Sequence, residues 1–590
     1  MAIFGWKDPD FERELLSSIS DALPWSVVER FSTLVRESGT AAERLAFDLL
    51  VQNLKDWGVP HILYEPVCLV SLPREARLLI RGDDTEEIRA KVPSFSVSTG
   101  QDWVEGELVY VPGGYAADIT QIFAPGAGIP TEARGRVVLT EGYPMPGKVS
   151  DFSRAGVLAA IFISPGEYIH EGICTPIWGS PDLDNIRLKP AIPVLAVSRS
   201  DGSRLKQLAA TGVRVAVKTR LQEDWRKIPV LVAEIPGRET PDEFVLVHGH
   251  LDSWHVGVGD NAVGDAVLLE LARVFWHHRH RLARTLRVAW WSGHSHGRYA
   301  GSTWYADTFA IELMERCVAQ VNCDSPGCRG ATSYERVMWM SEAEEVARSA
   351  IEDVTGAPAG GMRPLRAGDY SFNNLGISAF YMLLSEIPRA ERERLGLYAV
   401  GGCGGNIEWH TEDDTIEIAD RENLVRDARV YAAALARVLN APLHPFDYRR
   451  TVDEIAGHLQ RYAELAGPRF DLSPAMAEAR ALREELDVFY TRAEGLVGRP
   501  PADPQVRRFN RRQRQLARNL VPVNYTTGDR FRHAPAVELP PIPDLAPAAR
   551  LARVPENSAE FHLILTHLNR SRNRITWAFR EARQLLAEEL

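Results

Sequence analysis

The 590-residue sequence lacks several features that mark particular classes of protein. Its six cysteines form no CxxC pair and are too few for a disulfide scaffold, which excludes a small disulfide-stabilised fold. The N-terminus, MAIFGWKDPDFERELL, has no apolar core of the kind found in signal peptides. The longest apolar run, near residues 155–163, is too short to cross a bilayer. We therefore expect a cytoplasmic protein without disulfides that does not engage a membrane.

Basic residues are fewer than acidic residues, which gives a formal net charge of -11. This balance argues against general affinity for nucleic acid. One stretch is an exception, since residues 507–518 contain six arginines. The stretch fits either a phosphate-binding surface or a helix face that meets solvent or another subunit. Given the acidic excess elsewhere, we expect the second and predict no nucleic-acid partner.

The chain is too long for one hydrophobic core and reads as four stretches. Residues 1–60 are helical, with a capping-box sequence at Thr40–Glu43 and a stop at Gly58. In residues 61–220 short strands alternate with Gly and Pro; strands are expected at 136–140, 158–163 and 192–197 and a helix at 200–208. Residues 443–590 read as helices, interrupted by a proline-rich loop at 521–546.

Residues 221–442 alternate strand and helix. Strands are expected at 244–248, 286–291 and 318–322, and a helix at 262–276. This alternation predicts an α/β fold whose mixed, mostly parallel sheet is sandwiched by helices. The β-rich second stretch is then an insert, and the last stretch is a helical domain.

Potential metal ligands follow the strands of this sheet. Ligands in an open α/β sheet bind outside the carboxyl ends of the strands, so these side chains are expected to converge. Each is a weak signal alone, and their joint occurrence at successive strand ends favours a metal site. Imidazole and carboxylate together suit zinc, and also manganese, cobalt or iron. The candidates are His250, Asp252, Asp260, His294, His296, Asp324 and His410.

Several motifs in this order resemble those of the co-catalytic metallopeptidases, a family that includes bacterial zinc aminopeptidases, glutamate carboxypeptidase II and the transferrin receptor. The insert is similar to a protease-associated domain, and the helical C-terminal stretch is similar to the dimerisation domain of the glutamate carboxypeptidase branch, which implies a homodimer. The motifs are HLDSW at 250–254, GVGDN at 257–261, GSTWYA at 301–306, VNCDS at 321–325, GDYSF at 368–372 and WHTEDDT at 409–415.

The resemblance implies two divalent metal ions that Asp260 bridges, and zinc is the metal we expect. One ion is also held by His250 and Asp324, and the other by His410 and the residue at position 296. Counting back from Gly301 places Ser295 where the family has its glutamate base and His296 where it has a glutamate ligand. The resemblance gives Asp252 the role of orienting His250, in line with the general need of metal-bound imidazoles for a hydrogen-bond partner.

Ser295 cannot shuttle a proton as glutamate does, so the sequence leaves three outcomes open. His294 is the nearest substitute base, although His294 and His296 at a strand end point the same way and both could be ligands. Catalysis by a metal-bound hydroxide alone is the second outcome, and a non-catalytic scaffold that binds a partner in the cleft is the third. We expect a hydrolase that cleaves an amide or peptide bond with a metal-bound hydroxide, in a small molecule or short peptide.

Overall fold

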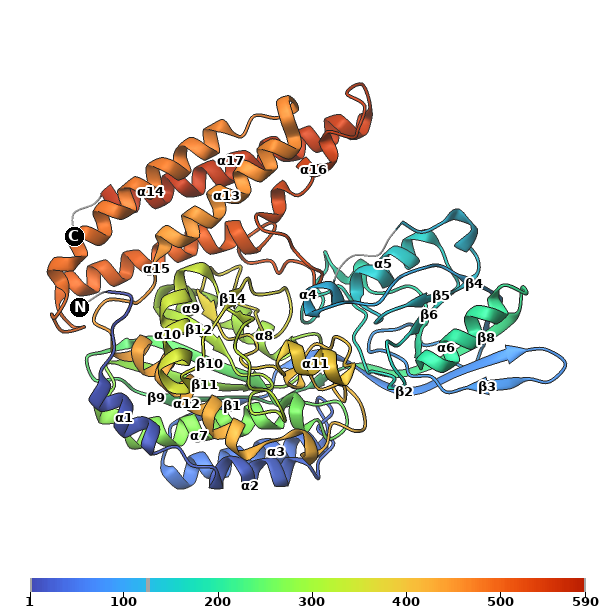
Figure 1. Ribbon diagram of the computed structural model, residues 1–590, viewed down its shortest axis with the longest axis horizontal. Coiled ribbons are helices and arrows are strands. Elements are labelled where there is room, and N and C mark those ends of the chain that lie inside the picture. The colour runs from blue at the N-terminus through green and yellow to red at the C-terminus, as the bar shows by residue number, and fades with distance from the viewer. Residues whose placement is uncertain (1–2, 124–127, 588–590) are drawn as a thin grey trace.

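The computed structural model describes residues 3–123 and 128–587. A central α/β part carries a β-rich part at one end and a layer of long helices along one side (Figure 1). Each of the six cysteines, all within the described ranges, is buried and free. Among the described helices, none is both long and apolar enough to cross a membrane.

The central sheet has the strand order β1-β9-β11-β10-β12-β15. β10 lies between β11 and β12 and is parallel to both, whereas β9 is antiparallel to β11 and to β1. The sheet is thus mixed and mostly parallel at its centre, as predicted. The strands are β1 (His61–Tyr64), β9 (Val230–Ile235), β10 (Thr240–His250), β11 (Arg284–Trp291), β12 (Cys317–Asn322) and β15 (Ala379–Phe380).

Alternate residues of β10 pack against helices on opposite faces of the sheet. Val245 and Val247 join the core formed with α7 (Val263–His277) and α12 (Arg421–Asn440). Phe244 and Leu246 join a separate cluster with residues of α8 (Ala300–Thr308) and α9 (Ala310–Arg316). Because both faces are covered, β10 is apolar over most of its length, which is the pattern of a buried parallel strand.

The N-terminal helices are α1 (Pro9–Ser17), α2 (Ala22–Phe31) and α3 (Ala41–Trp57). The Thr40 hydroxyl accepts a hydrogen bond from the backbone N–H of Glu43, and the Glu43 carboxylate accepts one from the N–H of Gly39. Gly58 ends α3 in the left-handed conformation. The Thr40 cap and the stop therefore form as predicted, but Glu43 bonds to the N–H of Gly39 and not to that of Thr40, as a capping box would require.

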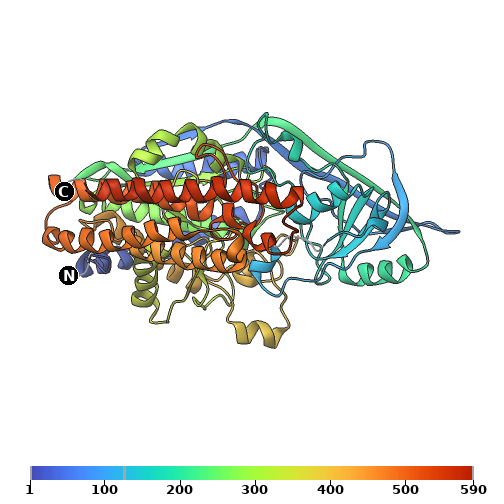
Figure 2. The same ribbon diagram turned by 90° about the horizontal axis from the view of Figure 1, so that it is seen from above.

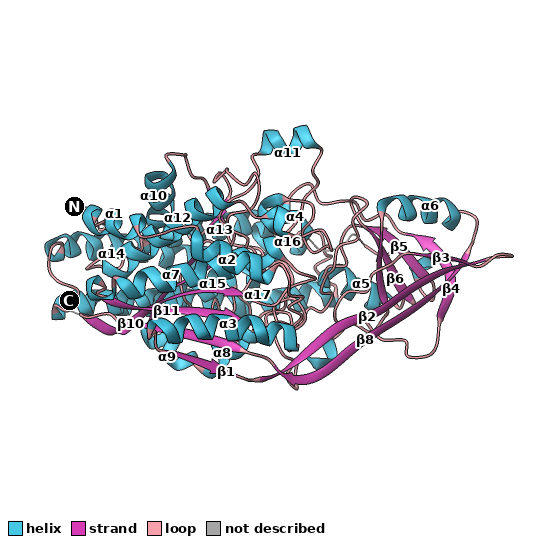
Figure 3. Cartoon of the chain, turned by 90° about the horizontal axis from the view of Figure 1, so that it is seen from below, coloured by secondary structure: helices cyan, strands magenta, loops and turns pink. Residues whose placement is uncertain are grey.

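The β-rich insert is built on a second sheet with the order β3-β2-β8-β4-β5-β6-β7. Two long antiparallel strands, β2 and β8, run from the central part into the insert (Figure 3). β1 pairs with β9, so residues 61–64 belong to the central sheet and not to the insert, where the prediction had placed them. The insert strands are β2 (Val67–Arg81), β3 (Glu86–Ile88), β4 (Val104–Tyr110), β5 (Val137–Glu141), β6 (Ala159–Ile163), β7 (Val194–Val197) and β8 (Arg214–Lys227).

The C-terminal part consists of long helices, and α17 runs nearly its full length (Figure 2). The arginine-rich stretch lies in α15, and several of its side chains face inward. Arg518 is buried and donates to the backbone carbonyls of Leu313, Cys317 and Gly376. The helices are α13 (Tyr448–Ala466), α14 (Ser473–Ala493), α15 (Pro504–Tyr525), α16 (Ala548–Leu551) and α17 (Ala559–Ala587).

The remaining elements are short. They connect the parts or cover the rim of the central sheet. They are α4 (Ile119–Ile122), α5 (Pro146–Ala155) and α6 (Arg199–Ala209) in the insert, and α10 (Glu344–Thr355), α11 (Arg389–Leu395), β13 (Val337–Met338) and β14 (Gly361–Met362) in the central part.

Candidate metal centre

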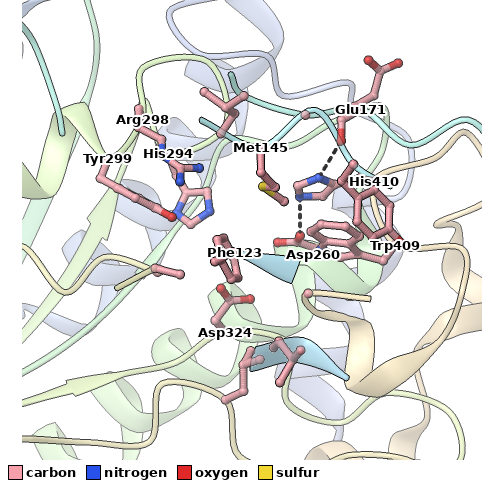
Figure 4. Close-up of a pocket in the computed structure, with 18 of the residues that line it drawn as sticks. Phe123, Met145, Glu171, Asp260, His294, Arg298, Tyr299, Asp324, Trp409 and His410 are labelled. Carbon is pink, nitrogen blue, oxygen red and sulfur yellow. Dashed lines mark hydrogen bonds and ion pairs between the residues drawn. The ribbon is translucent and has the colours of Figure 1, made fainter. Parts of the chain in front are cut away.

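A cavity opens at the carboxyl ends of the central strands, where the sequence predicted a site. Asp260, His294, Asp324 and His410 line it (Figure 4). His250 lies directly behind, at the end of β10, with its ring stacked on that of His294 at 3.7 Å between centroids. His250, His294 and Asp324 each present a potential ligand atom, and these atoms lie within 4.8 Å of one another.

The same ring nitrogen, Nδ1, is hydrogen-bonded in His250, His294 and His410. The Nδ1 atom of each faces an acceptor oxygen: the Asp252 backbone carbonyl at 2.9 Å, the Asp369 carboxylate at 2.9 Å and the Glu171 backbone carbonyl at 3.1 Å. An oxygen of this kind only accepts, so Nδ1 must carry the proton. In the neutral ring Nε2 is then a free lone pair, which is the form that binds a metal.

Asp260 lies between two of these nitrogen atoms. Its Oδ1 is 2.9 Å from Nε2 of His250, and its Oδ2 is 3.0 Å from Nε2 of His410. His250 Nε2 and Asp260 Oδ1 are buried and have no hydrogen-bond partner. Lone pairs facing each other at this distance repel unless a proton or a metal cation lies between them. The donor set therefore fits a cation on each side of Asp260.

The pKa values of the cavity carboxyl groups also favour a bound cation. Burial, and then the negative charge of Asp260, raise the pKa of Asp324 to about 6. Burial also disfavours the charged form of Asp260, but the imidazoles of His250 and His410 beside its two oxygens hold the pKa of its carboxyl well below the usual range. Carboxylates crowded together in a buried site are stabilised by a divalent cation.

Asp414 and Asn261 fix the turn that carries Asp260. The Asp414 carboxylate accepts hydrogen bonds from the backbone N–H groups of Gly259 at 2.7 Å and Asp260 at 3.0 Å. Asn261 donates to the carbonyls of His250 and Cys323. These contacts tie the ends of β10 and β12 to the turn and to the segment that carries His410.

His296 does not lie on the cavity wall, although counting back from Gly301 had assigned it a ligand position. Its Nδ1 lies 3.3 Å from the backbone N of Ser38 and 3.0 Å from the Ser38 Oγ, whose hydroxyl donates to Asp252 at 2.8 Å. The ring packs against Trp254 at 4.2 Å between centroids. Its Nε2 is buried without a hydrogen-bond partner among the described residues, and the ring is not part of the cavity lining to which Asp260 and His410 belong.

The reason is that β11 ends at Trp291, so His294 and His296 lie in a turn and not on a strand end. Arg298 and Tyr299 both have positive φ, at 50° and 70°, and reverse the chain before α8. In such a turn residues two apart need not point the same way, contrary to the expectation from strand geometry. Ser295 is buried and is likewise absent from the cavity wall, so it does not occupy the position of a base.

The Asp252 carboxylate supports this turn. It accepts hydrogen bonds from the backbone N–H groups of His294 at 3.0 Å and Ser295 at 2.8 Å, and from the Ser38 hydroxyl at 2.8 Å. Its distance to His250 Nδ1 is 3.9 Å, so the carbonyl of Asp252, and not the predicted carboxylate, orients His250. Hydrogen bonding and the charges of nearby histidines hold the pKa of Asp252 low against the opposing effect of its burial.

Sequence reasoning missed the supporting acceptors. Asp369 lies in the GDYSF motif and Asp414 in the WHTEDDT motif, so both motifs carried a signal that was not used. Glu171, whose carbonyl orients His410, comes from the insert, and no local pattern marks it. Trp409 stacks on His410 at 3.8 Å between centroids and forms part of the apolar wall.

Comparison with known proteins agrees with this arrangement. Residues 231–435 match the sequence profile of Peptidase family M28. Carboxypeptidase Q of Bos taurus is 26% identical over 300 residues, which are 47% of this chain and 60% of that protein. Aminopeptidase NAALADL1 of Mus musculus is 31% identical over 162 residues, which are 26% of this chain and 20% of that protein. The chain therefore spans less than two thirds of the length of these relatives.

Solved structures share the fold. A zinc aminopeptidase from Bacillus subtilis superposes with a TM-score of 0.53 at 20% identity, covering 71% of this chain and 95% of that one. A peptidase M28 precursor from Shewanella amazonensis gives 0.54 at 19% identity, covering 73% and 96%. The match to peptidase family M28 thus covers residues 231–435, which hold most of the metal-site residues, and the structure has the fold of zinc aminopeptidases.

Proposed function

We propose that this protein is a metal-dependent hydrolase of amide or peptide bonds. The observation that carries the proposal is the convergence of three imidazoles, each with Nε2 left free, and two carboxylates on one cavity. Such an arrangement is costly to bury without a cation.

His250, Asp260 and Asp324 would hold the first divalent ion, which we take to be zinc because the set combines imidazole with carboxylate. Asp260 and His410 would hold a second. Three protein ligands leave an open coordination position, as in catalytic zinc sites. A divalent ion in such a site polarises a carbonyl oxygen and lowers the pKa of a water molecule.

His294 is then available as the proton acceptor that Ser295 cannot be. Its Nδ1 is held by Asp369, whose other oxygen accepts from the Ser302 hydroxyl at 2.7 Å. A histidine oriented by a carboxylate is a common general base, with its Nε2 directed to the reacting water. Hydrolysis consumes one water: the acyl carbon gains the hydroxyl as the C–N bond breaks, and the nitrogen gains the proton through His294.

The test combines metal content with hydrolysis. Purified protein is analysed for zinc and assayed with short peptides and N-acylated amino acids, before and after treatment with a chelator. We expect bound zinc and cleavage that the chelator abolishes and zinc restores. Asp260→Asn should lose both, whereas His280→Ala, an exposed histidine outside the cavity, should change neither. Zinc binding without cleavage of any substrate would support a non-catalytic scaffold instead.

A further inference from the structure

Arg298 is a buried cation without a carboxylate partner on the wall of the cavity. Its side chain is 4% exposed and lies beside His294 (Figure 4). Its guanidinium makes one long contact, from Nη2 to the Ala536 carbonyl at 3.5 Å, and packs over the Tyr299 ring. Its Nε has no hydrogen-bond partner among the described residues. Burying a guanidinium in this state is costly, so the group is incomplete without an anion.

A second buried arginine, Arg366, lies near Arg298. Arg366 stacks on Trp178 at 3.5 Å, and Trp178 packs on Tyr299. Its N–H groups are directed to the carbonyls of Ala534, Pro535 and Tyr370, and burial lowers its pKa to about 9. Arg366 thus adds positive charge to this wall but has its donors engaged, which leaves Arg298 as the cation with free donors.

The opposite wall offers no free acid for an amino group. Glu171 lines the cavity, but its carboxylate is paired with Lys91 at 3.2 Å and with His255 at 3.2 Å. Asp260 and Asp324 face the imidazoles of the metal site. A substrate with a free ammonium group next to the scissile bond would therefore meet an unpaired cation and no unpaired anion within the described lining.

The rest of the lining is apolar and suits a hydrocarbon side chain. Phe123, Tyr143, Met145, Ile173 and Met382 contribute to it. Small-molecule sites commonly combine such a wall with a few polar groups that fix the orientation of the ligand.

Resting on the proposed hydrolase function, we propose that Arg298 binds the free carboxylate of the substrate residue whose amide nitrogen departs. The substrate is then a peptide or N-acylated amino acid with a free C-terminal carboxylate and an apolar side chain. A guanidinium pairs with a carboxylate through parallel N–H···O bonds, which fixes position as well as charge. The scissile carbonyl of such a ligand would be directed toward the metal ligands beside His294.

Binding tests the inference independently of catalysis. The probes are N-acetyl-L-leucine and N-acetyl-L-leucinamide, which differ in the carboxylate alone. Both are titrated calorimetrically into zinc-loaded and metal-free protein. We expect the acid to bind about 10- to 100-fold more tightly than the amide in both forms, the range for a hydrogen bond to a charged group. Arg298→Gln should remove this preference by weakening the acid only, and Arg298→Lys should restore part of it.

The controls separate the outcomes. Arg389→Gln, a change at an exposed arginine, should leave the preference intact. Thermal unfolding of each variant shows that it is folded. Equal affinity for acid and amide, no binding of either, or a preference that survives Arg298→Gln because the metal alone holds the carboxylate would each overturn the inference. Preference for the acid without cleavage of any substrate would instead overturn the proposed hydrolase function.

Discussion

The imidazoles of His294 and His296 are two residues apart and have opposite surroundings. His294 lies on the cavity wall with its Nδ1 on Asp369, whereas His296 accepts a hydrogen bond from Ser38 and packs on Trp254. The placement of each ring, on the cavity wall or outside it, decides which histidine can reach a metal ion or a water molecule in the cavity.

This contrast gives a matched pair of substitutions. His294→Gln should lower kcat by about 10²–10⁴-fold, the usual contribution of a general base. Zinc binding should persist because His250, Asp260 and Asp324 remain. His296→Gln should leave kcat largely unchanged and lower thermal stability. Rates and zinc content measured on both variants decide the matter. Equal losses of kcat, or a greater loss in His296→Gln, would contradict the assignment.

The two ions should differ in affinity, because His296 does not complete the second site. In the proposed centre the first ion would have His250, Asp260 and Asp324 as protein ligands, and the second would have Asp260 and His410. Titration of metal-free protein with zinc should show one tight and one weaker step. His410→Ala should remove the weaker step and His250→Ala the tighter one. Two steps of equal affinity, both lost in either variant, would contradict this order.

At the scale of elements, the loop after β10 is held by a buried arginine of the N-terminal segment. Arg36 donates from Nε to the carbonyl of Leu251 at 2.9 Å, from Nη1 to that of Val256 at 2.7 Å and from Nη2 to that of Gly257 at 3.0 Å. These bonds satisfy carbonyl groups of the loop, of which that of Gly257 also accepts from the N–H of Ala262, and they fix the segment between His250 and Asp260.

Arg36→Met should therefore act on both stability and the site. The methionine fills much of the space but leaves buried carbonyls without donors, at a cost of about 2–4 kcal/mol in the free energy of unfolding. Zinc affinity should fall as well, since the loop positions two ligands. Urea unfolding and zinc titration measure these effects. Arg13→Met, at an exposed position, is the control, and an equal effect there would contradict the role of Arg36.

Much of the element pattern could be predicted from the sequence. The period of apolar residues predicted β10, β11, β12 and α7, and the capping box at Thr40 predicted the start of α3. The pairing of β1 with β9 could not be predicted, because it depends on contacts between segments more than 160 residues apart. The full turn after β11 was also missed: Gly293, with a φ of 79°, signals its start, but the positive φ at Arg298 and Tyr299 has no glycine to signal it.

At the scale of the whole molecule, the cavity is assembled from the insert, the central part and the C-terminal part. Phe123, Met145 and Glu171 come from the insert, and the metal site comes from the central part. The Ala534 and Ala536 carbonyls of the C-terminal part contact Arg366 and Arg298. The homodimer and the cytoplasmic location stay predictions, the first of which light scattering on purified protein can test.

A buried ion cluster joins the central and C-terminal parts. Glu243 of β10 contacts Arg284 of β11 at 3.0 Å, His444 at 3.2 Å and Arg514 of α15. Burial favours protonation of Glu243, but its hydrogen bond with His444 and the charges of Arg284 and Arg514 hold its pKa well below 4.5. Burial lowers the pKa of His444 to about 3, so this ring is neutral at pH 7 and the arginines supply the positive charge.

Because the pKa of Glu243 is lower in the folded state, its stabilising effect is complete above pH 4.5, the usual value, and is lost as the pH falls further. The loss amounts to about 1.4 kcal/mol per pH unit for one group. Glu243→Gln should lower stability at pH 7 and reduce the slope of stability against pH below 4.5. Chemical unfolding measured from roughly pH 3 to about pH 7 gives both the stability and its slope against pH. An unchanged slope would contradict the contribution of Glu243.

The sequence by itself determined the fold class and the motifs that carry most of the candidate metal ligands, because strand and helix periods and short motifs are local properties of the chain. Only the tertiary structure decided which histidine faces the cavity, which oxygen orients each ring and which arginine lacks a partner. These depend on the path of a turn and on hydrogen bonds between segments distant in sequence, and neither leaves a local pattern in the order of residues.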